Sequence, residues 1–278
     1  GTLAGALTTS SVVMSVQATG AMAVIIADVP GLAEPGATAK LATLGVLTGL
    51  FMLAAGVARL GTLVRYVPNA VLTGFVNAVA VNIVIGQLSG ATGYSSAAPN
   101  RLLRAVDTLL HVAEFHWPTV VVALSTLAMI LLLERTRLGS LGLVAAIVIA
   151  SAASALIPGL HVPVLADLAA VPQSLPGPVL PSLEWVRALL VPAASLAFVG
   201  LVQGAAISHS LPNPDGTYLD PSRDFTGQGV ANLASAVFTG MPVGGSMSAT
   251  SLVHAAGGRG RAANLTAGAV MIVTILVL

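Results

Sequence analysis

Six long apolar runs constrain the fold of this chain more than any other feature. They occupy residues 38–58, 67–88, 117–133, 139–157, 188–209 and 261–278. A helix needs about 20 mostly apolar residues to cross a bilayer, and these runs approach that length. Only 8% of the residues are charged, against about 25% in a typical soluble protein. The apolar side chains are therefore expected to face lipid.

Three further apolar stretches are interrupted by small and polar residues. They lie at 8–28, 226–239 and 243–256, which makes about nine membrane segments in all. In hydrocarbon every backbone amide must be satisfied within the protein, so only helices or closed barrels are possible. The strict alternation of barrel strands is absent. The sequence predicts an all-α, multi-pass membrane protein.

Lysine and arginine predict the orientation of this protein, because cytoplasmic loops carry more of them. If successive connections alternate between the two sides, one side collects Arg59, Arg65, Arg135, Arg137, Arg223, Arg259 and Arg261. The other side collects Lys40, Arg101, Arg104 and Arg187. We expect the first side to be cytoplasmic and the protein to lie in the cell membrane.

Composition also argues against several other functions. The net charge of +1 suggests no nucleic-acid partner. The absence of cysteine excludes a disulfide framework and a thiolate metal site. The histidines show no metal-binding spacing, so neither a metal nor a cofactor is expected. An intramembrane enzyme would need aspartates at membrane depth, but the aspartates fall at segment ends or in connections.

Two interrupted stretches far apart in sequence resemble each other. They are Thr8–Met22 and Gly240–His254, and each places hydroxyls and glycines before a short run of small residues. Paired interruptions of this kind are typical of a transporter's midplane binding site. A helix that begins inside the membrane exposes unpaired amides and about half a positive charge. Two such N-termini could hold an anion without a cationic side chain.

The alternative interpretation is that both stretches are ordinary helix-packing surfaces. Small residues and hydroxyls are common where membrane helices touch. The similarity of the two stretches favours the binding-site interpretation over this one.

Two longer motifs carry a resemblance to the sulfate permease (SulP) family, which includes the anion exchangers of solute carrier family 26. One runs from Arg59 to Pro68 and continues through Val71–Asn77. The other runs from Gly227 to Leu233 and continues through Gly240–Ser248. The resemblance covers nearly the whole chain.

The resemblance implies a uracil-permease-like fold of two inverted seven-segment repeats, here truncated at both ends. It implies one partial transport domain over residues 1–278, with a core domain at about 8–58 and 188–278 and a gate domain at about 59–157. The family is usually dimeric and carries a cytoplasmic STAS domain, which we expect to lie outside residues 1–278. We therefore expect a homodimer in the lipid bilayer.

The resemblance also assigns the substrate site. Thr19 matches the family's substrate-facing threonine, with Gln17 and Gly20 beside it, while Ala18 replaces a proline. In the second stretch, Ser246, Met247 and Ser248 match the family's Ser-x-Ser at a half-helix start. Ala249 stands where the family often has arginine. The predicted substrate-binding residues are Gln17, Thr19, Gly20, Gln203, Gly245, Ser246, Met247, Ser248 and Ala249.

Gln203 occupies the position of a carboxylate that serves proton or sodium coupling in some bacterial members. Glutamine cannot carry a proton or neutralise sodium. The hypothesis is therefore exchange, facilitated movement, or coupling through another group.

The leading hypothesis is a secondary transporter, an antiporter or symporter, that moves sulfate, bicarbonate, chloride or a similar anion by alternating access. A nucleobase permease of the same fold is one alternative, although such permeases use carboxylates that are not visible here. A non-transporting or channel-like relative is another.

Overall fold

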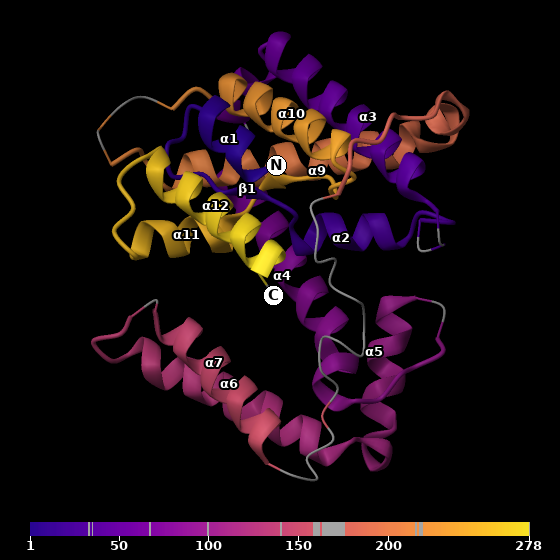
Figure 1. The fold of residues 1–278 in the computed structure, drawn as a ribbon, viewed down its shortest axis with the longest axis vertical. Coiled ribbons are helices and arrows are strands. Elements are labelled where there is room, and N and C mark those ends of the chain that lie inside the picture. The colour runs from indigo at the N-terminus through magenta and orange to yellow at the C-terminus, as the bar shows by residue number, and fades with distance from the viewer. Residues whose placement is uncertain are drawn as a thin grey trace. The chain divides into compact units, whose positions relative to one another are not determined.

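The computed structural model describes residues 1–32, 34, 36–66, 68–98, 100–139, 141–157, 162, 176–214, 216 and 219–277. The described chain is mostly helical (Figure 1). Its α-helices are α1 (Thr2–Thr8), α2 (Gly20–Ala27), α3 (Thr38–Val57), α4 (Asn69–Thr92), α5 (Arg101–Leu110), α6 (Trp117–Glu134), α7 (Leu141–Leu156), α9 (Val186–Ser210), α10 (Pro221–Val237), α11 (Met247–Ala255) and α12 (Arg261–Val277). Short 3-10 helices occupy Leu60–Tyr66, Val112–Glu114 and Leu183–Trp185, and two strands, β1 (Val16–Gln17) and β2 (Gly244–Gly245), pair with each other.

The chain divides into two compact units. The first comprises Gly1–Val76 with Pro172–Leu278, and the second comprises Asn77–Val171. The predicted division into a core domain and a gate domain stays a prediction. Each unit is described by itself below.

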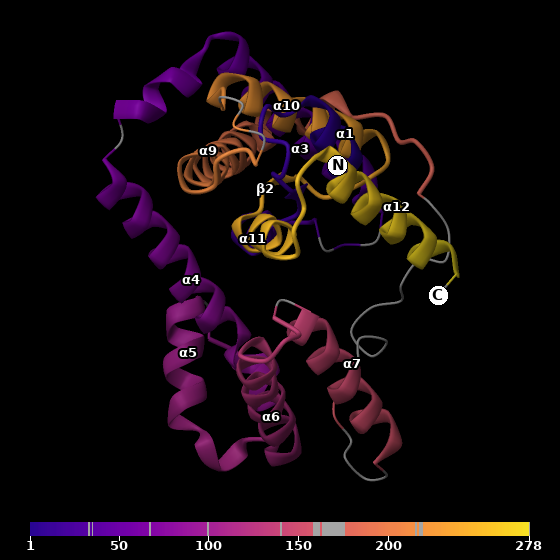
Figure 2. The same cartoon turned by 90° about the vertical axis from the view of Figure 1, so that its left-hand side faces the viewer.

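In the first unit, α3 packs along α10 and α9 (Figures 1 and 2). Small residues allow this close packing. A Cβ atom added to Gly49 would lie 2.9 Å from the backbone oxygen of Gly229, so α3 and α10 meet backbone to backbone. Such contacts are typical of membrane helices, where no hydrophobic effect drives association. Met22, Met52 and Leu196 are fully buried in the core that these helices enclose.

In the second unit, α6 and α7 pack against each other, and α5 follows α4. Large apolar side chains of α6 and α7 remain exposed, including Leu124, Leu132 and Val148. Exposed apolar area of this extent is expected where a helix faces lipid rather than water.

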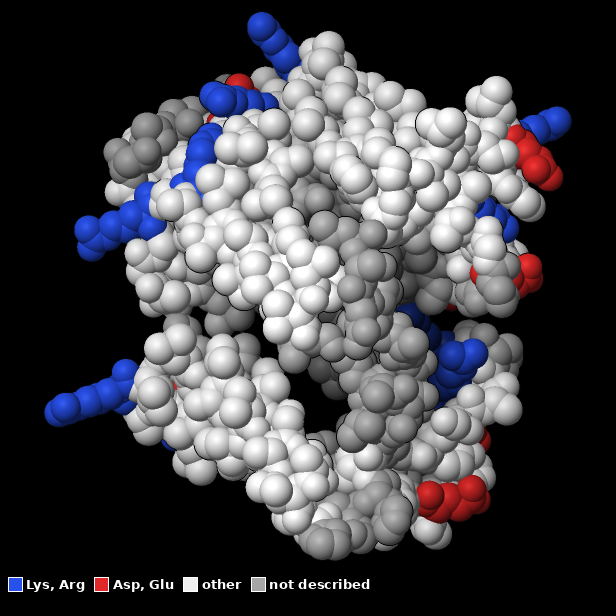
Figure 3. Space-filling view, viewed as in Figure 1, with Lys and Arg blue, Asp and Glu red and all other residues white. Residues whose placement is uncertain are grey.

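Three of the described helical stretches are long and apolar enough to cross a membrane: Thr38–Val57, Trp117–Glu134 and Leu183–Ser210. Leu141–Leu156 and Arg261–Val277 are shorter apolar helices. Over the face in Figure 3, charged side chains are few and most of the surface is uncharged.

The predicted apolar runs at 38–58, 117–133 and 188–209 correspond to helices α3, α6 and α9. The remaining runs correspond to α4, α7 and α12, and the stretches at 226–239 and 243–256 fall on α10 and α11.

Two helix starts lie outside the apolar runs and interrupted stretches that the sequence defines. Helix α10 begins at Pro221, because Asp220 accepts hydrogen bonds from the amides of Ser222 (2.9 Å) and Arg223 (3.3 Å). Asn100 caps α5 by accepting a hydrogen bond from the Leu103 amide at 2.8 Å. Only helices were expected, yet β1 and β2 form a short antiparallel pair.

Candidate functional site

The two interrupted stretches meet in the first unit through the β1–β2 pair. Val16 lies opposite Gly245 and Gln17 lies opposite Gly244 in antiparallel register. The Ser246 amide donates to the Ser15 carbonyl at 2.9 Å, and the Ser15 amide donates to Thr250 Oγ1 at 3.0 Å. Segments separated by more than 200 residues in sequence are thus joined by backbone pairing. The expectation that they lie together is met.

Helix α2 begins directly after β1, and Thr19 is its N-cap. The Thr19 hydroxyl accepts from the Met22 amide at 3.3 Å, and the Ala23 amide donates to the Thr19 carbonyl at 2.9 Å. The amides of Gly20 and Ala21 come before the first intrahelical bond and have no acceptor within α2. Gly20 is exposed, whereas Ala21 is buried.

Helix α11 begins directly after β2 in the same way. The Ser246 hydroxyl accepts from the Ala249 amide at 3.4 Å, and the Thr250 amide donates to the Ser246 carbonyl at 2.9 Å. The amides of Met247 and Ser248 are therefore the two left without an acceptor in α11. Ser248 is exposed, while Met247 and Ala249 are half-buried.

The antiparallel strand pair joins the two segments from which α2 and α11 begin. Each strand leads within three residues into its helix, and the strands run beside each other in opposite directions. Each helix start carries a partial positive charge and free amide donors. None of the nine predicted site residues carries a charge. The attraction for an anion at this place would come from backbone dipoles and hydroxyl groups alone.

The structure also brings Gln17 and Gln203 to these helix starts. Thr19 Oγ1 donates to Gln203 Oε1 of α9 at 3.1 Å, so Gln203 lies beside the α2 N-cap. Gln17 Nε2 lies 3.5 Å from Ser246 Oγ, and the Ser246 and Ser248 hydroxyl oxygens are 3.4 Å apart. These contacts link the residues that the sequence assigned to one site.

Two residues of α10 that the sequence reading did not assign to the site hold β2 in place. Gln228 Oε1 accepts from the Gly245 amide at 3.0 Å. Asn232 pairs with the Val243 backbone twice, accepting at 2.8 Å and donating at 2.6 Å. Both side chains are fully buried. Two amide side chains four residues apart on an apolar helix were the signal that could have identified them.

The segment before β1 is held by side chains from three other parts of the chain. Asp224 accepts from the Ser10 amide at 2.6 Å and from the Ser11 amide at 3.0 Å, and Ser208 of α9 donates to its second oxygen at 2.8 Å. Asn213 accepts from the Val12 amide at 3.0 Å.

Two residues of α12 complete this support. Arg261 donates to the Ala6 carbonyl at 2.5 Å and to the Thr9 carbonyl at 2.6 Å, at the C-terminal end of α1. Asn264 donates to the Met14 carbonyl at 3.1 Å. The sequence predicted for Arg261 a role chiefly in orientation, with attraction of anions as a minor alternative. A contact with α1 could not be predicted from so distant a position in the chain.

Close backbone approach also places β2 against α9. A Cβ atom added to Gly245 would lie 3.0 Å from Gly204 Cα and 3.0 Å from Ile207 Cδ1. A side chain at this position would push β2 away from α9, and Gln203 lies on that helix. Glycine at this position thus allows the close approach of β2 to α9.

Comparisons with known proteins identify the family to which this chain is similar. The model of the "Sulfate permease family" matches residues 1–278. The chain is 34% identical over 238 residues to the probable sulfate transporter MT1781 of Mycobacterium tuberculosis. This alignment covers 84% of this chain and 42% of the relative. It is 26% identical over 248 residues to the bicarbonate transporter BicA of Synechocystis, covering 84% of this chain and 42% of the relative. The chain thus spans less than half the length of these relatives.

Solved structures show the same fold. The transmembrane domain of a cyanobacterial bicarbonate transporter, BicA, superposes with a TM-score of 0.81 at 23% identity, covering 99% of this chain and 73% of that one. The structure of SLC26A9 superposes with a TM-score of 0.81 at 20% identity, covering 99% of this chain and 48% of that one. The family match over the whole length and the shared fold together show that this chain belongs to the sulfate permease family.

Proposed function

We propose that this chain forms part of a secondary transporter that binds a small inorganic anion between the N-termini of α2 and α11. The observation that carries the proposal is the antiparallel pairing of β1 with β2. It joins the two segments that lead into these helices, and it supports a site framed by Thr19, the cap of α2, and Ser246, the cap of α11. Sulfate, bicarbonate and chloride are the candidate anions.

The chemistry of the site suits an anion better than a neutral ring. The groups available are backbone amides and hydroxyls, and helix N-termini bind anions in many unrelated proteins. A nucleobase permease would need carboxylates to accept hydrogen bonds from the base, and the predicted site residues include none. The names of the relatives, which include sulfate and bicarbonate transporters, point the same way.

Transport by alternating access fits the division of the chain into two units. In this proposal the first unit is the core domain that carries the site, and the second belongs to the gate domain. The finer features implied by the family belong to the same proposal: two inverted seven-segment repeats, a homodimer, and a location in the cell membrane. Movement of the core against the gate would expose the site to each side in turn.

The mode of coupling in this proposal is exchange or facilitated movement. Gln203 receives a hydrogen bond from Thr19 and has no ionisable group to couple a proton. Asp224 is buried in the same unit, but both of its oxygens already accept hydrogen bonds, from Ser10, Ser11 and Ser208. Asp224 therefore serves to hold the segment before β1.

Uptake of radiolabelled sulfate and bicarbonate into liposomes that contain the full-length protein tests the proposal. The variant Ser248→Glu places a negative charge at the α11 N-terminus, and we expect it to abolish uptake of either anion. Ser248→Gln has nearly the same size without the charge and is expected to retain measurable uptake. Equal uptake by the wild type and the glutamate variant would remove the α11 N-terminus from the site.

The coupling mode needs a second arm of the same experiment. Uptake is measured with and without an imposed proton or sodium gradient, and we expect counter-anion on the opposite side to stimulate it more than either gradient. A strong gradient effect that persists in Gln203→Ala would contradict exchange and assign coupling to another group.

A further inference from the structure

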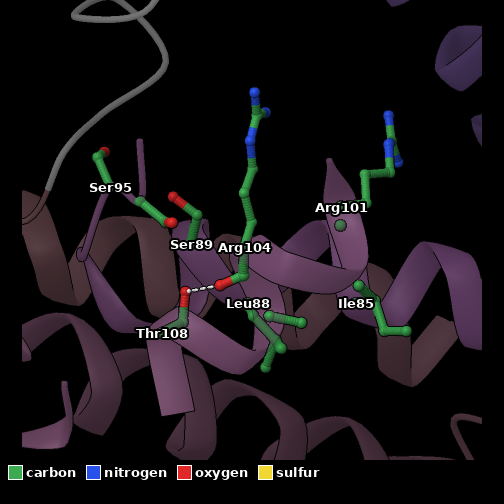
Figure 4. Close-up of a pocket in the computed structure, with 10 residues that line it drawn as sticks. Ile85, Leu88, Ser89, Ser95, Arg101, Arg104 and Thr108 are labelled. Atoms are coloured by element: carbon green, nitrogen blue, oxygen red, sulfur yellow. Dashed lines mark hydrogen bonds between the residues drawn. The ribbon is translucent and has the colours of Figure 1, made fainter. Parts of the chain in front are cut away.

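The second unit contains a basic pocket that the transport site does not use. It has a volume of about 260 Å³ and lies between α4, the loop after it, and α5. Its polar lining comes from Arg101 and Arg104 on α5 and from Ser89, Ser95 and Ser96 (Figure 4). None of the described residues that line it carries a carboxylate. The pocket therefore has a net positive charge with hydroxyl donors beside it.

The two guanidinium groups are available to a ligand. In Figure 4 the side chains of Arg101 and Arg104 extend in the same direction from α5. Arg104 Nε donates to the Ala98 carbonyl at 2.7 Å, which orients the group; among the residues that the structure describes, its terminal nitrogens have no hydrogen-bond partner. Within the part of the chain that the structure describes, Arg101 makes no hydrogen bond or ion pair. Gly86 makes room for it, since a Cβ atom there would lie 2.8 Å from Arg101 Nη1.

The nearest acidic side chain on α5 is already engaged. Asp107 Oδ2 accepts from the Tyr94 hydroxyl at 3.2 Å, and Asp107 Oδ1 lies 3.2 Å from His111 Nδ1. Asp107 is not among the residues that line the pocket. Asp107 is also hydrogen-bonded by Ser96, which does line the pocket, and no described residue forms an ion pair with either arginine.

Helix α5 also carries an exposed apolar face. It is formed by Leu102, Val106 and Leu109, which are 67%, 53% and 61% exposed, together with Leu103 and Leu110. Ala105 and Thr108 are buried on the opposite face. With ten residues α5 is too short to span a bilayer. A short helix with one exposed apolar face and arginines beside it has the character of a helix that lies in the membrane interface.

We propose that this pocket binds the phosphate headgroup of an anionic phospholipid. The two arginines of the pocket and the exposed apolar face of α5 are independent observations, and both suit an anionic phospholipid. Arginine binds phosphate through paired hydrogen bonds, and the serine hydroxyls supply further donors. The apolar face of α5 places the helix at the depth where headgroups lie, with the leucines toward the acyl chains. A free oxyanion would satisfy the arginines but would leave the leucines unexplained.

Native mass spectrometry of the full-length protein in detergent, titrated with phosphatidylglycerol or phosphatidylcholine, tests this inference. Each arginine near a membrane surface contributes about 1 kcal/mol to the binding of anionic lipid, so we expect Arg101→Gln/Arg104→Gln to bind phosphatidylglycerol roughly 30-fold more weakly. Binding of zwitterionic phosphatidylcholine is expected to change much less. Inorganic phosphate, added at millimolar concentration, is not expected to displace the bound lipid.

Arg135→Gln/Arg137→Gln is the matched control, because it removes two arginines from the same unit outside the pocket. We expect it to leave the tightest phosphatidylglycerol site in place. Equal losses in the two double variants would overturn the assignment. Displacement of the lipid by inorganic phosphate would also overturn it and would show that the pocket takes a free oxyanion. Sulfate uptake by the pocket variant shows whether it is folded and keeps this test separate from that of the transport site.

Discussion

The Thr19 hydroxyl takes part in two hydrogen bonds at the start of α2. It accepts from the Met22 amide and donates to Gln203 Oε1, so one oxygen both caps the helix and connects it to α9. Thr19 is 9% exposed, and its neighbours Ala18 and Gly20 are exposed. The residue is thus placed to position the α2 amides and to contribute a donor itself.

Replacing Thr19 by valine removes both hydrogen bonds while keeping the shape of the side chain. Loss of a helix N-cap costs about 1 kcal/mol, which corresponds to about fivefold in affinity if the whole cost falls on anion binding. We expect the KM for uptake to rise by about this factor, with a smaller change in the maximal rate. Thr19→Ser keeps the oxygen and should behave like the wild type. An unchanged KM in the valine variant would argue against a role for Thr19 at the site.

The pKa of His111 offers a test of the contacts at the end of α5 that requires no transport measurement. Its pKa is raised above its usual 6.5, chiefly by the hydrogen bond with the backbone carbonyl of Asp107 and further by the negative charges of Asp107 and Glu114. Protonated His111 therefore stabilises the end of α5 below pH 6.5. This contribution is lost as the pH rises through the raised pKa.

The raised pKa can be measured by NMR titration of the histidine ring. Asp107→Asn removes the carboxylate but keeps the backbone carbonyl, so we expect the pKa of His111 to fall. Glu114→Gln should lower it less, because the Glu114 charge is the smaller cause. A His111 pKa at or below 6.5 in the wild type would contradict the contacts at this end of α5.

Among the secondary-structure elements, α12 supports the site from a distance. Arg261 holds the C-terminal carbonyls of α1, and Asn264 holds the Met14 carbonyl just before β1. Asp224 of α10 holds the amides of the same segment. The position of β1, and with it the start of α2, therefore depends on α10 and α12 as well as on β2.

Arg261→Gln tests this support. Hydrogen bonds from charged groups contribute about 1.5–3 kcal/mol, so we expect a lower unfolding temperature and faster amide exchange in the segment between α1 and β1. Arg259→Gln removes the same charge from an exposed residue close by and should change stability by less than about 0.5 kcal/mol. Equal behaviour of the two variants in thermal unfolding and hydrogen exchange would show that the contacts of Arg261 with α1 contribute nothing.

At the scale of the whole molecule, hydropathy predicted the helices well and missed features that depend on contacts between distant residues. Apolar runs located α3, α6 and α9 to within a few residues, because lipid-facing length is a property of local sequence. The starts of α5 and α10 were missed because caps at Asn100 and Asp220 outweigh the polar composition that follows.

The candidate site shows the same division between local and long-range information. The similarity of the two stretches predicted that they act together, and the structure pairs strands β1 and β2 within them. The family resemblance, not this similarity, singled out Thr19 and Ser246. Gln228 and Asn232 were not assigned because their partners, Gly245 and Val243, are backbone groups beyond the end of their own helix. These contacts depend on how α10 packs against β2. The spacing of the two amide side chains could mark the residues but could not predict their partners.

Anomalous diffraction from crystals of the full-length protein grown with selenate tests the central claim most directly. Selenate has the charge and shape of sulfate, and its selenium can be located without reference to the protein. The account predicts one selenium peak whose oxygens lie about 3 Å from the free amides of both helices, those of Gly20 or Ala21 in α2 and of Met247 or Ser248 in α11. Selenate bound at neither helix start, or at one start alone, would contradict it.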